Sequence, residues 1–139
     1  FHHFPDINQP FAEMIRVLKP SGKLVLIDME AAEEPLRETE DAIERMRDPS
    51  HVRNLSREEM LSLYRRHGIT GSFCETVRMP MVLQNRLDHT KTPEMVQNEI
   101  TALMENELSG GKKTGFSPYR RGGEICFDHR WVMMIGSME

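Results

Sequence analysis

Residues 19–29 read KPSGKLVLIDM, and this stretch decides the fold class. Pro20, Ser21 and Gly22 end the helical pattern that precedes them, because proline and glycine punctuate regular structure. Residues 23–29 then form a short, continuous apolar run, which favours a strand covered on both faces of a parallel sheet. A helix that leads through a tight turn into a buried strand is typical of α/β proteins. We therefore predict an α/β fold.

Helices are predicted before and after this strand in the sequence. Apolar residues recur at helical spacing up to residue 18, and Asn8 is the expected N-cap of that helix. Residues 31–47 are acidic and weakly periodic, and we interpret them as a helix. Ser56 and Glu59 have the spacing of a capping box, which marks the start of a third helix.

The remainder of the chain predicts two strands separated by a helix and a loop. Residues 69–79 alternate between apolar and polar side chains, which indicates a half-exposed edge strand. Thr92 is the expected N-cap of a helix that continues to residue 108. Residues 109–123 are rich in glycine and basic residues, which predicts a mobile loop, and residues 124–134 predict the final strand.

Composition places the chain among ordinary globular proteins. Its 139 residues predict one core over residues 1–139, and a net charge of −4 does not favour nucleic-acid partners. No apolar run reaches the roughly 20 residues that cross a bilayer, so no membrane contact is expected. Cys74 and Cys126 have no metal or disulfide spacing, which favours reduced thiols and a cytoplasmic location.

Three segments resemble one enzyme family. Residues 1–6 (FHHFPD) and 11–24 (FAEMIRVLKPSGKL) are similar to the stretch after the fourth strand of class I S-adenosylmethionine-dependent methyltransferases, with Ser21 where glycine is usual. Residues 47–53 (RDPSHVR) resemble a segment of the subgroup that includes the ubiquinone and menaquinone biosynthesis methyltransferases. The resemblance extends over essentially the whole chain.

The resemblance implies that this chain is the C-terminal half of a Rossmann-like methyltransferase fold. In that family the strand order is 3-2-1-4-5-7-6, so the chain would supply strands 5, 7 and 6, with strand 7 antiparallel. The glycine-rich cofactor loop after strand 1 has no counterpart in the sequence. Residues 83–123 would then be an insertion beside the methyl acceptor, together with a mobile loop.

The functional expectation has two forms. As the resemblance implies, the intact parent protein transfers a methyl group from S-adenosylmethionine to a small organic acceptor, while this chain alone binds no cofactor and is inactive. The alternative is a non-enzymatic fragment or interaction module that self-associates. The methyl acceptor itself cannot be read from the sequence.

Candidate site residues follow from the same segments. His2 and His3 would lie at the end of strand 4, where an imidazole can orient or deprotonate the methyl acceptor, so they are weak candidates for catalysis. A remnant of a purification tag and a purely structural pair of histidines are the alternatives. Within this resemblance we also assign His2 and Phe4 to the cofactor side of the site.

Five residues are candidates for substrate binding. Asp28 ends a strand at the position where open α/β sheets bind ligands. An acid, an imidazole and a guanidinium also occur within six residues, a combination suited to a polar or carboxylate-bearing ligand. A turn carboxylate and surface salt bridges are the competing interpretations. The substrate-binding set is His3, Asp28, Asp48, His51 and Arg53, and no spacing indicates a metal site.

Strand 23–29 also predicts self-association. Without strand 4 beside it, its apolar edge would be unpaired, and an unpaired edge invites another chain. We therefore expect a homodimer formed through the edge of residues 23–29. The basic residues of the loop, namely Lys112, Lys113, Arg120 and Arg121, are interpreted as a solvated face rather than as a nucleic-acid site.

Overall fold

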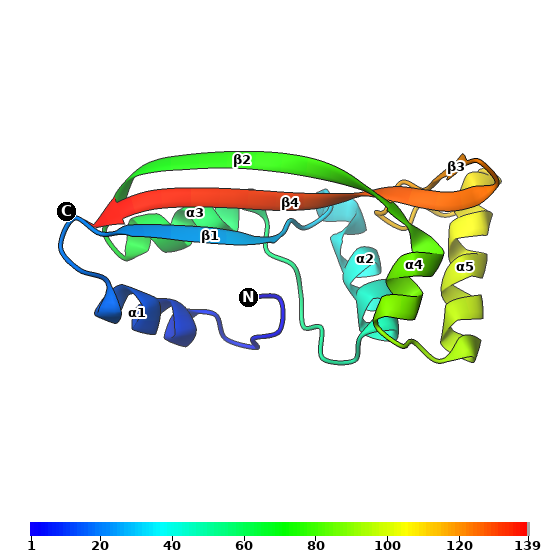
Figure 1. Cartoon of the computed structure of the whole chain (residues 1–139), viewed down its shortest axis with the longest axis horizontal. Helices are drawn as coiled ribbons and strands as arrows, with labels where there is room; N and C mark the ends of the chain where they lie inside the picture. Colours follow the sequence, from blue (N-terminus) through cyan, green and yellow to red (C-terminus); the bar gives the residue numbers. More distant parts are fainter. Residues whose placement is uncertain (139) are drawn as a thin grey trace. The chain divides into compact units, whose positions relative to one another are not determined.

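In the computed structural model, which describes residues 1–138 apart from the side chains at positions 71 and 72, the strands form one sheet. The order is β1 (Lys23–Met29), β4 (Glu124–Met138) and β2 (Ile69–Val82), and the short β3 (Tyr119–Arg121) pairs with β4. β1 and β4 run antiparallel, from the pair Lys23–Ser137 to the pair Met29–Trp131 (Figure 1). The helices are α1 (Asn8–Val17), α2 (Glu34–Arg47), α3 (Arg57–Arg66), α4 (Leu83–His89) and α5 (Glu94–Leu108).

The chain divides into two units. Unit 1 comprises residues 1–31, 53–77 and those from 130 onward, and unit 2 comprises residues 32–52 and 78–129. Unit 1 therefore contains β1, α1 and α3, whereas unit 2 contains α2, α4, α5 and β3. β2 and β4 contribute residues to both units.

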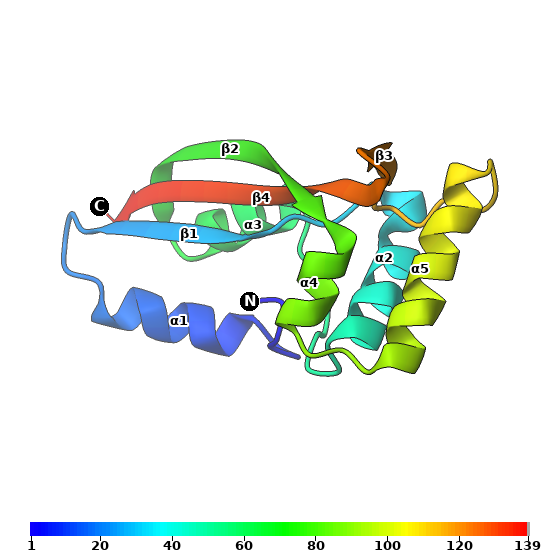
Figure 2. The same cartoon turned by 45° about the vertical axis from the view of Figure 1, so that its right-hand side comes forward.

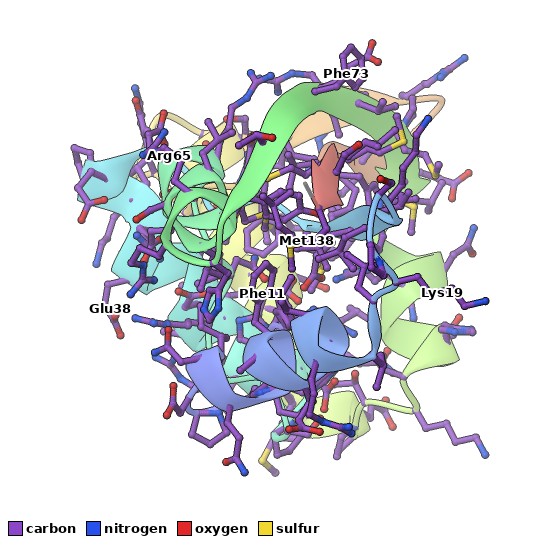
Figure 3. All side chains as sticks on the ribbon, turned by 90° about the vertical axis from the view of Figure 1, so that its left-hand side faces the viewer. Phe11, Lys19, Glu38, Arg65, Phe73 and Met138 are labelled. Carbon is purple, nitrogen blue, oxygen red and sulfur yellow. The ribbon has the colours of Figure 1, made fainter. Side chains whose placement is uncertain are left out.

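The core of unit 1 lies between its two helices and one face of its strands. Phe11 of α1 and Tyr64 of α3 are fully buried, with ring centroids 5.5 Å apart. The Tyr64 hydroxyl donates to the carbonyls of Leu24 at 3.3 Å and Met134 at 3.1 Å, and burial raises the pKa of Tyr64 to about 12. Figure 3 shows Phe11 pointing from α1 into this core. The helices thus cover one side of the unit 1 strands.

The core of unit 2 is formed by helices that lie alongside one another (Figure 2). Ile43 of α2, Leu87 of α4 and Ile100 of α5 are buried in one cluster with residues of β4. Phe116 and Phe127 complete this cluster with an edge-to-face ring contact at 5.4 Å. Aromatic pairs favour this geometry because a positive ring edge meets a negative face.

Several predictions from local signals are confirmed. The chain has an α/β fold, and the strand at residues 23–29 has the predicted bounds. Ser56 Oγ accepts from the Glu59 amide at 3.1 Å, while the Ser56 amide donates to Glu59 Oε1 at 2.9 Å, so the capping box is present. The helix predicted from residues 31–47 is α2, and β2 lies at one edge of the described sheet.

Both N-cap predictions from Asn8 and Thr92 are wrong. α1 begins at Asn8 itself, and Asp6 Oδ1 accepts from both the backbone amide and the side-chain Nδ2 of Asn8, each at 3.0 Å. Pro93 is the N-cap of α5, and the buried Thr92 hydroxyl instead donates to the carbonyl of Arg47 at 3.2 Å. In each case a nearby polar partner attracts the side chain that was expected to cap the helix.

The strands also differ from the sequence-based expectation. Val25 and Ile27 are 52% and 59% exposed, so β1 is not covered on both faces in the described structure. β2 continues past Pro80 to Val82, and α4, which the sequence pattern did not reveal, follows at once. Part of the expected loop at residues 109–123 is β3, which turns through two glycines into β4.

Candidate functional site

Asp28 is the centre of the candidate site in unit 1. It lies near the end of β1, and its carboxylate is buried and surrounded by hydrogen-bond donors. Oδ1 is 2.7 Å from Nδ1 of His2 and accepts from the Met29 amide at 2.8 Å, while Oδ2 is 2.6 Å from the α-amino nitrogen of Phe1. Burial alone would favour the neutral acid, but these donors outweigh it and hold the pKa of Asp28 well below its usual range. Asp28 is therefore an anion.

The His2 imidazole is oriented by this anion. An ionised carboxylate can only accept, so Nδ1 of His2 donates to Asp28, and this contact fixes the orientation of the ring. The His3 ring lies with its centroid 4.1 Å from that of His2 and is exposed. Phe4 is 45% exposed and makes an edge contact with Phe1. Of the predicted site residues, the structure thus brings His2, His3 and Asp28 together.

The other predicted substrate residues have further partners. Asp48 Oδ1 accepts from the Ser50 amide at 3.0 Å and from its hydroxyl at 2.6 Å, which stabilises a turn after α2. His51 is buried, with Nε2 2.8 Å from Oδ1 of Asp41. The Arg53 amide donates to the carbonyl of His2 at 3.3 Å. A shared role in substrate binding for these residues stays a prediction.

A buried cluster of charges in unit 2 was missed from the sequence. Glu44 Oε2 accepts from Arg47 Nη2 at 2.6 Å and from Arg86 Nη2 at 3.1 Å, and little of the three side chains is exposed. Burial raises the pKa of Glu44, but the two guanidinium groups outweigh it and lower that pKa overall. Glu44 and Arg47 are three residues apart in an acidic helix, a spacing that is usually read as a solvated face.

Two of the hollows in unit 2 differ in size. A cavity of about 10 Å³ is lined by the three charged residues together with Ile43, Leu83, Leu87, Ile100, Met104, Phe116 and Phe127. That volume holds about one water molecule, so it does not admit an organic methyl acceptor in this conformation. A larger hollow of about 290 Å³ is lined by Pro80, Met81, Val82, Tyr119, Arg121, Glu124 and Cys126.

Two further classes of site are absent from the described residues. No group of three or more histidine, cysteine or acidic side chains that could hold a metal ion occurs within residues 1–138. In the same part of the chain, no helix has the length and apolar character needed to span a membrane.

Comparison with known proteins relates the chain to methyltransferases. It is 31% identical over 137 residues to the uncharacterized methyltransferase YcgJ of Bacillus subtilis (strain 168), a match that covers 97% of this chain and 54% of YcgJ. The crystal structure of YcgJ has a TM-score of 0.83 to this chain, covering 99% of it and 60% of the YcgJ chain at 24% identity. The chain is a homologue of methyltransferases and shares the class I methyltransferase fold.

Two other solved structures share this fold. A putative methyltransferase (BH2331) from Bacillus halodurans C-125 has a TM-score of 0.79 at 22% identity, covering 98% of this chain and 64% of its own. Haemonchus contortus phosphoethanolamine N-methyltransferase 2, solved with phosphomonomethylethanolamine and S-adenosylhomocysteine, has a TM-score of 0.54 at 12% identity, covering 99% of this chain and 31% of its own. No family model matches the chain.

The chain spans about half the length of the curated relatives it matches. Similarity to the ubiquinone and menaquinone subgroup in particular stays a prediction.

The turns that follow the strands bear on cofactor binding. Within residues 1–138, no strand leads through a glycine-rich turn into a helix: residues 30–33 follow β1 without a glycine, and β2 runs directly into α4. Gly122 and Gly123 follow β3, but they form the turn into β4.

Proposed function

We propose that this chain is the methyl-acceptor side of a methyltransferase that transfers a methyl group from S-adenosylmethionine to a small organic molecule. The contact between His2 and the buried Asp28 anion carries this proposal. The homology to YcgJ supports methyl transfer as the class of reaction. The cofactor would supply the electrophilic methyl group, and its binding residues would lie on the part of the protein that corresponds to the unmatched length of YcgJ.

The role of His2 follows from its orientation. We infer that the imidazole held by Asp28 orients or deprotonates the methyl acceptor. The Asp28 carboxylate would stabilise the imidazolium that forms, because an adjacent anion favours the charged ring. Asp28 is thus a positioning residue, and His2 is the candidate catalytic residue.

The test uses a chimera in which this chain replaces the part of YcgJ that it matches. Methyl transfer from labelled S-adenosylmethionine is measured with a panel of small hydroxylated, carboxylated and amine acceptors. His2→Gln should lower kcat by roughly 100-fold or more with little change in KM, since general-base catalysis contributes about 10²- to 10⁴-fold. Asp28→Asn should also lower kcat, and it should alter the pH profile of kcat.

The matched control is His89→Gln, because His89 is an exposed histidine at the end of α4. This variant should retain the parental kcat. A His2→Gln chimera that also keeps the parental kcat with every active acceptor would refute the catalytic role of His2. No methyl transfer to any acceptor by a folded chimera would count against the proposed function itself.

For the chain alone, we propose that it does not bind the cofactor. The missing glycine-rich turn supports this proposal. Calorimetric titration of the 139 residues with S-adenosylhomocysteine should give no heat of binding. Micromolar affinity would contradict the proposal, because it would show that these residues form a cofactor site.

A second candidate function is self-association of the isolated chain. It is favoured by the position of β1 at the end of the described strand order, with two exposed apolar side chains. We propose that two copies pair along the edge of β1, since unpaired strand edges add further strands. Sedimentation at micromolar concentration should show a dimer, and a monomer across that range would refute edge pairing.

A further inference from the structure

The larger hollow of unit 2, with a volume of about 290 Å³, lies on one face of β4. Side chains alternate between the two faces of a strand. Ile125 and Phe127 of β4 pack with the helices in the unit 2 core. Glu124 and Cys126, which line the hollow, therefore point to the opposite face of the strand. We call this space the β3 hollow, because β3 forms one of its sides.

The side formed by β3 is set by its register against β4. Tyr119 is opposite Cys126, and the next residue on the same face, Arg121, is opposite Glu124. Directly opposed residues of an antiparallel pair lie on the same face of a sheet. The Tyr119 hydroxyl donates to Asp128 Oδ1 at 2.7 Å, which holds the tyrosine side chain against β4. The lining is completed by residues of β2, namely Pro80, Met81 and Val82.

The β3 hollow combines apolar groups with one charge of each sign. Most of its lining is apolar, and Cys126 is buried within it. Arg121 and Glu124 are both exposed, and among the described residues no salt bridge joins either of them to another side chain. The Cβ atoms of directly opposed residues are about 5 Å apart. A cation and an anion therefore stand side by side at the rim of the hollow.

These features favour one class of ligand. A volume of about 290 Å³ is close to the roughly 300 Å³ at the lower end of small-molecule sites, so the hollow has room for one small molecule. A simple anion is attracted by Arg121 and repelled by Glu124, and a simple cation meets the reverse. A zwitterion pairs with both residues, because its two charges are a few ångströms apart. Its apolar part can then enter the hollow and leave water.

We propose that the β3 hollow binds a free amino acid with an apolar side chain. The carboxylate of the ligand pairs with the Arg121 guanidinium, whose planar donors match a carboxylate. Its ammonium group pairs with Glu124, and its side chain lies against Val82 and Cys126. The affinity is weak, with a dissociation constant on the order of 1–10 mM, because exposed ion pairs are screened by solvent.

This binding does not depend on methyl transfer. The lining of the β3 hollow contains neither His2 nor Asp28, on which the proposed reaction depends. Loss of amino-acid binding would therefore leave the proposed function untouched, and the failure of methyl transfer would leave this proposal untouched.

The test is a titration of the isotope-labelled chain with L-leucine, followed through the amide resonances of the protein. Two derivatives each remove one charge of the ligand: N-acetyl-L-leucine lacks the ammonium group, and L-leucine amide lacks the carboxylate. Arg121→Gln and Glu124→Gln remove the corresponding partners on the protein. The matched control is Arg120→Gln, because Arg120 is also exposed, but it is opposite Ile125 and therefore on the other face of β3.

L-leucine should shift the amide resonances of Tyr119 and Cys126 in a saturable manner. Each derivative should bind about fivefold more weakly than L-leucine, as should L-leucine to Arg121→Gln or to Glu124→Gln, since this is the range of an exposed ion pair. The control Arg120→Gln should bind L-leucine as the parent does. Amide resonances far from the hollow should stay in place in every variant, which shows that the fold is retained.

Three results would overturn the proposal. The first is the absence of a saturable shift around the β3 hollow up to about 50 mM L-leucine, well above the expected dissociation constant. The second is equal binding of L-leucine and both derivatives, because the paired charges would then not recognise the ligand. The third is an equal weakening by Arg120→Gln and Arg121→Gln, which would show a general effect of net charge.

Discussion

Glu44→Gln should destabilise unit 2 by removing the charge that holds two buried guanidinium groups. The substitution keeps the shape of the side chain, but both hydrogen bonds, at 2.6 Å to Arg47 and 3.1 Å to Arg86, lose their anionic acceptor. A hydrogen bond to a charged group contributes about 1.5–3 kcal/mol, against about 1 kcal/mol for a neutral one. Because the two buried cations also lose their compensating charge, we expect a loss of about 2–4 kcal/mol in the free energy of unfolding.

The measurement is urea unfolding followed by circular dichroism, with Glu38→Gln as the matched control. Glu38 is on the same helix and bonds Arg45 at 2.9 Å, but its side chain is 87% exposed, so its removal should cost less than about 1 kcal/mol. Surface substitutions usually change the free energy of unfolding by no more than about 0.5 kcal/mol. A change within that range for Glu44→Gln would refute the reasoning.

The effect of Glu44→Gln should also depend on pH. The folded-state pKa of Glu44 lies below its ordinary value of 4.5, so ionised Glu44 stabilises the folded state above that value. This stabilisation is lost as the pH falls through the folded-state pKa. The difference in stability between parent and variant should therefore be full at neutral pH and should narrow as the pH falls below 4.5.

Three further predictions concern the core and one helix cap of unit 1. Gly136→Ala should destabilise the protein by about 1–3 kcal/mol, because an added Cβ would collide with Ile69 and lie 2.9 Å from the Tyr64 ring. If this collision causes the loss, Gly136→Ala should cost little when it is made in an Ile69→Ala background. Additive losses of the two substitutions would contradict the collision. Tyr64→Phe should cost about 1–2 kcal/mol through the loss of its hydrogen bonds to two strand carbonyls; an unchanged denaturation midpoint would show that those bonds contribute nothing. Ser56→Ala should lower the free energy of unfolding by about 1 kcal/mol, because it leaves the Glu59 amide uncapped. Ser56→Asp should keep most of the parental stability, and equal losses in the two variants would contradict the role of the cap.

Local sequence signals predicted those parts of the fold that depend on neighbouring residues. The capping box at Ser56, the strand at residues 23–29 and the turn between α1 and β1 are set by backbone preferences over a few positions. Ser21 in that turn has φ 63°, which is the conformation that favours the glycine usual at this position in the family. The sequence resemblance extended these signals to a class I methyltransferase fold, which the comparison with YcgJ confirmed.

The candidate site was only partly accessible from the sequence. His2 and Asp28 were each proposed separately, but 26 positions separate them, and no local pattern predicts that Asp28 would orient the imidazole. His51 was proposed for substrate binding, and no local pattern predicted its buried contact with Asp41 or the contacts of Glu44 with two guanidinium groups. Their burial depends on where α4, α5 and the final strand pack, which a helical period cannot specify.

By itself, the sequence determined the α/β class, most element positions and the relationship to methyltransferases, because these depend on short-range preferences and on recognisable motifs. Only the tertiary structure decided which charges are buried, which carboxylate holds His2 and which face of the unit 1 strands is left apolar and exposed. The physical reason is that burial and pairing depend on contacts between residues far apart in the chain. Identical local patterns can therefore become either a solvated surface or a buried one.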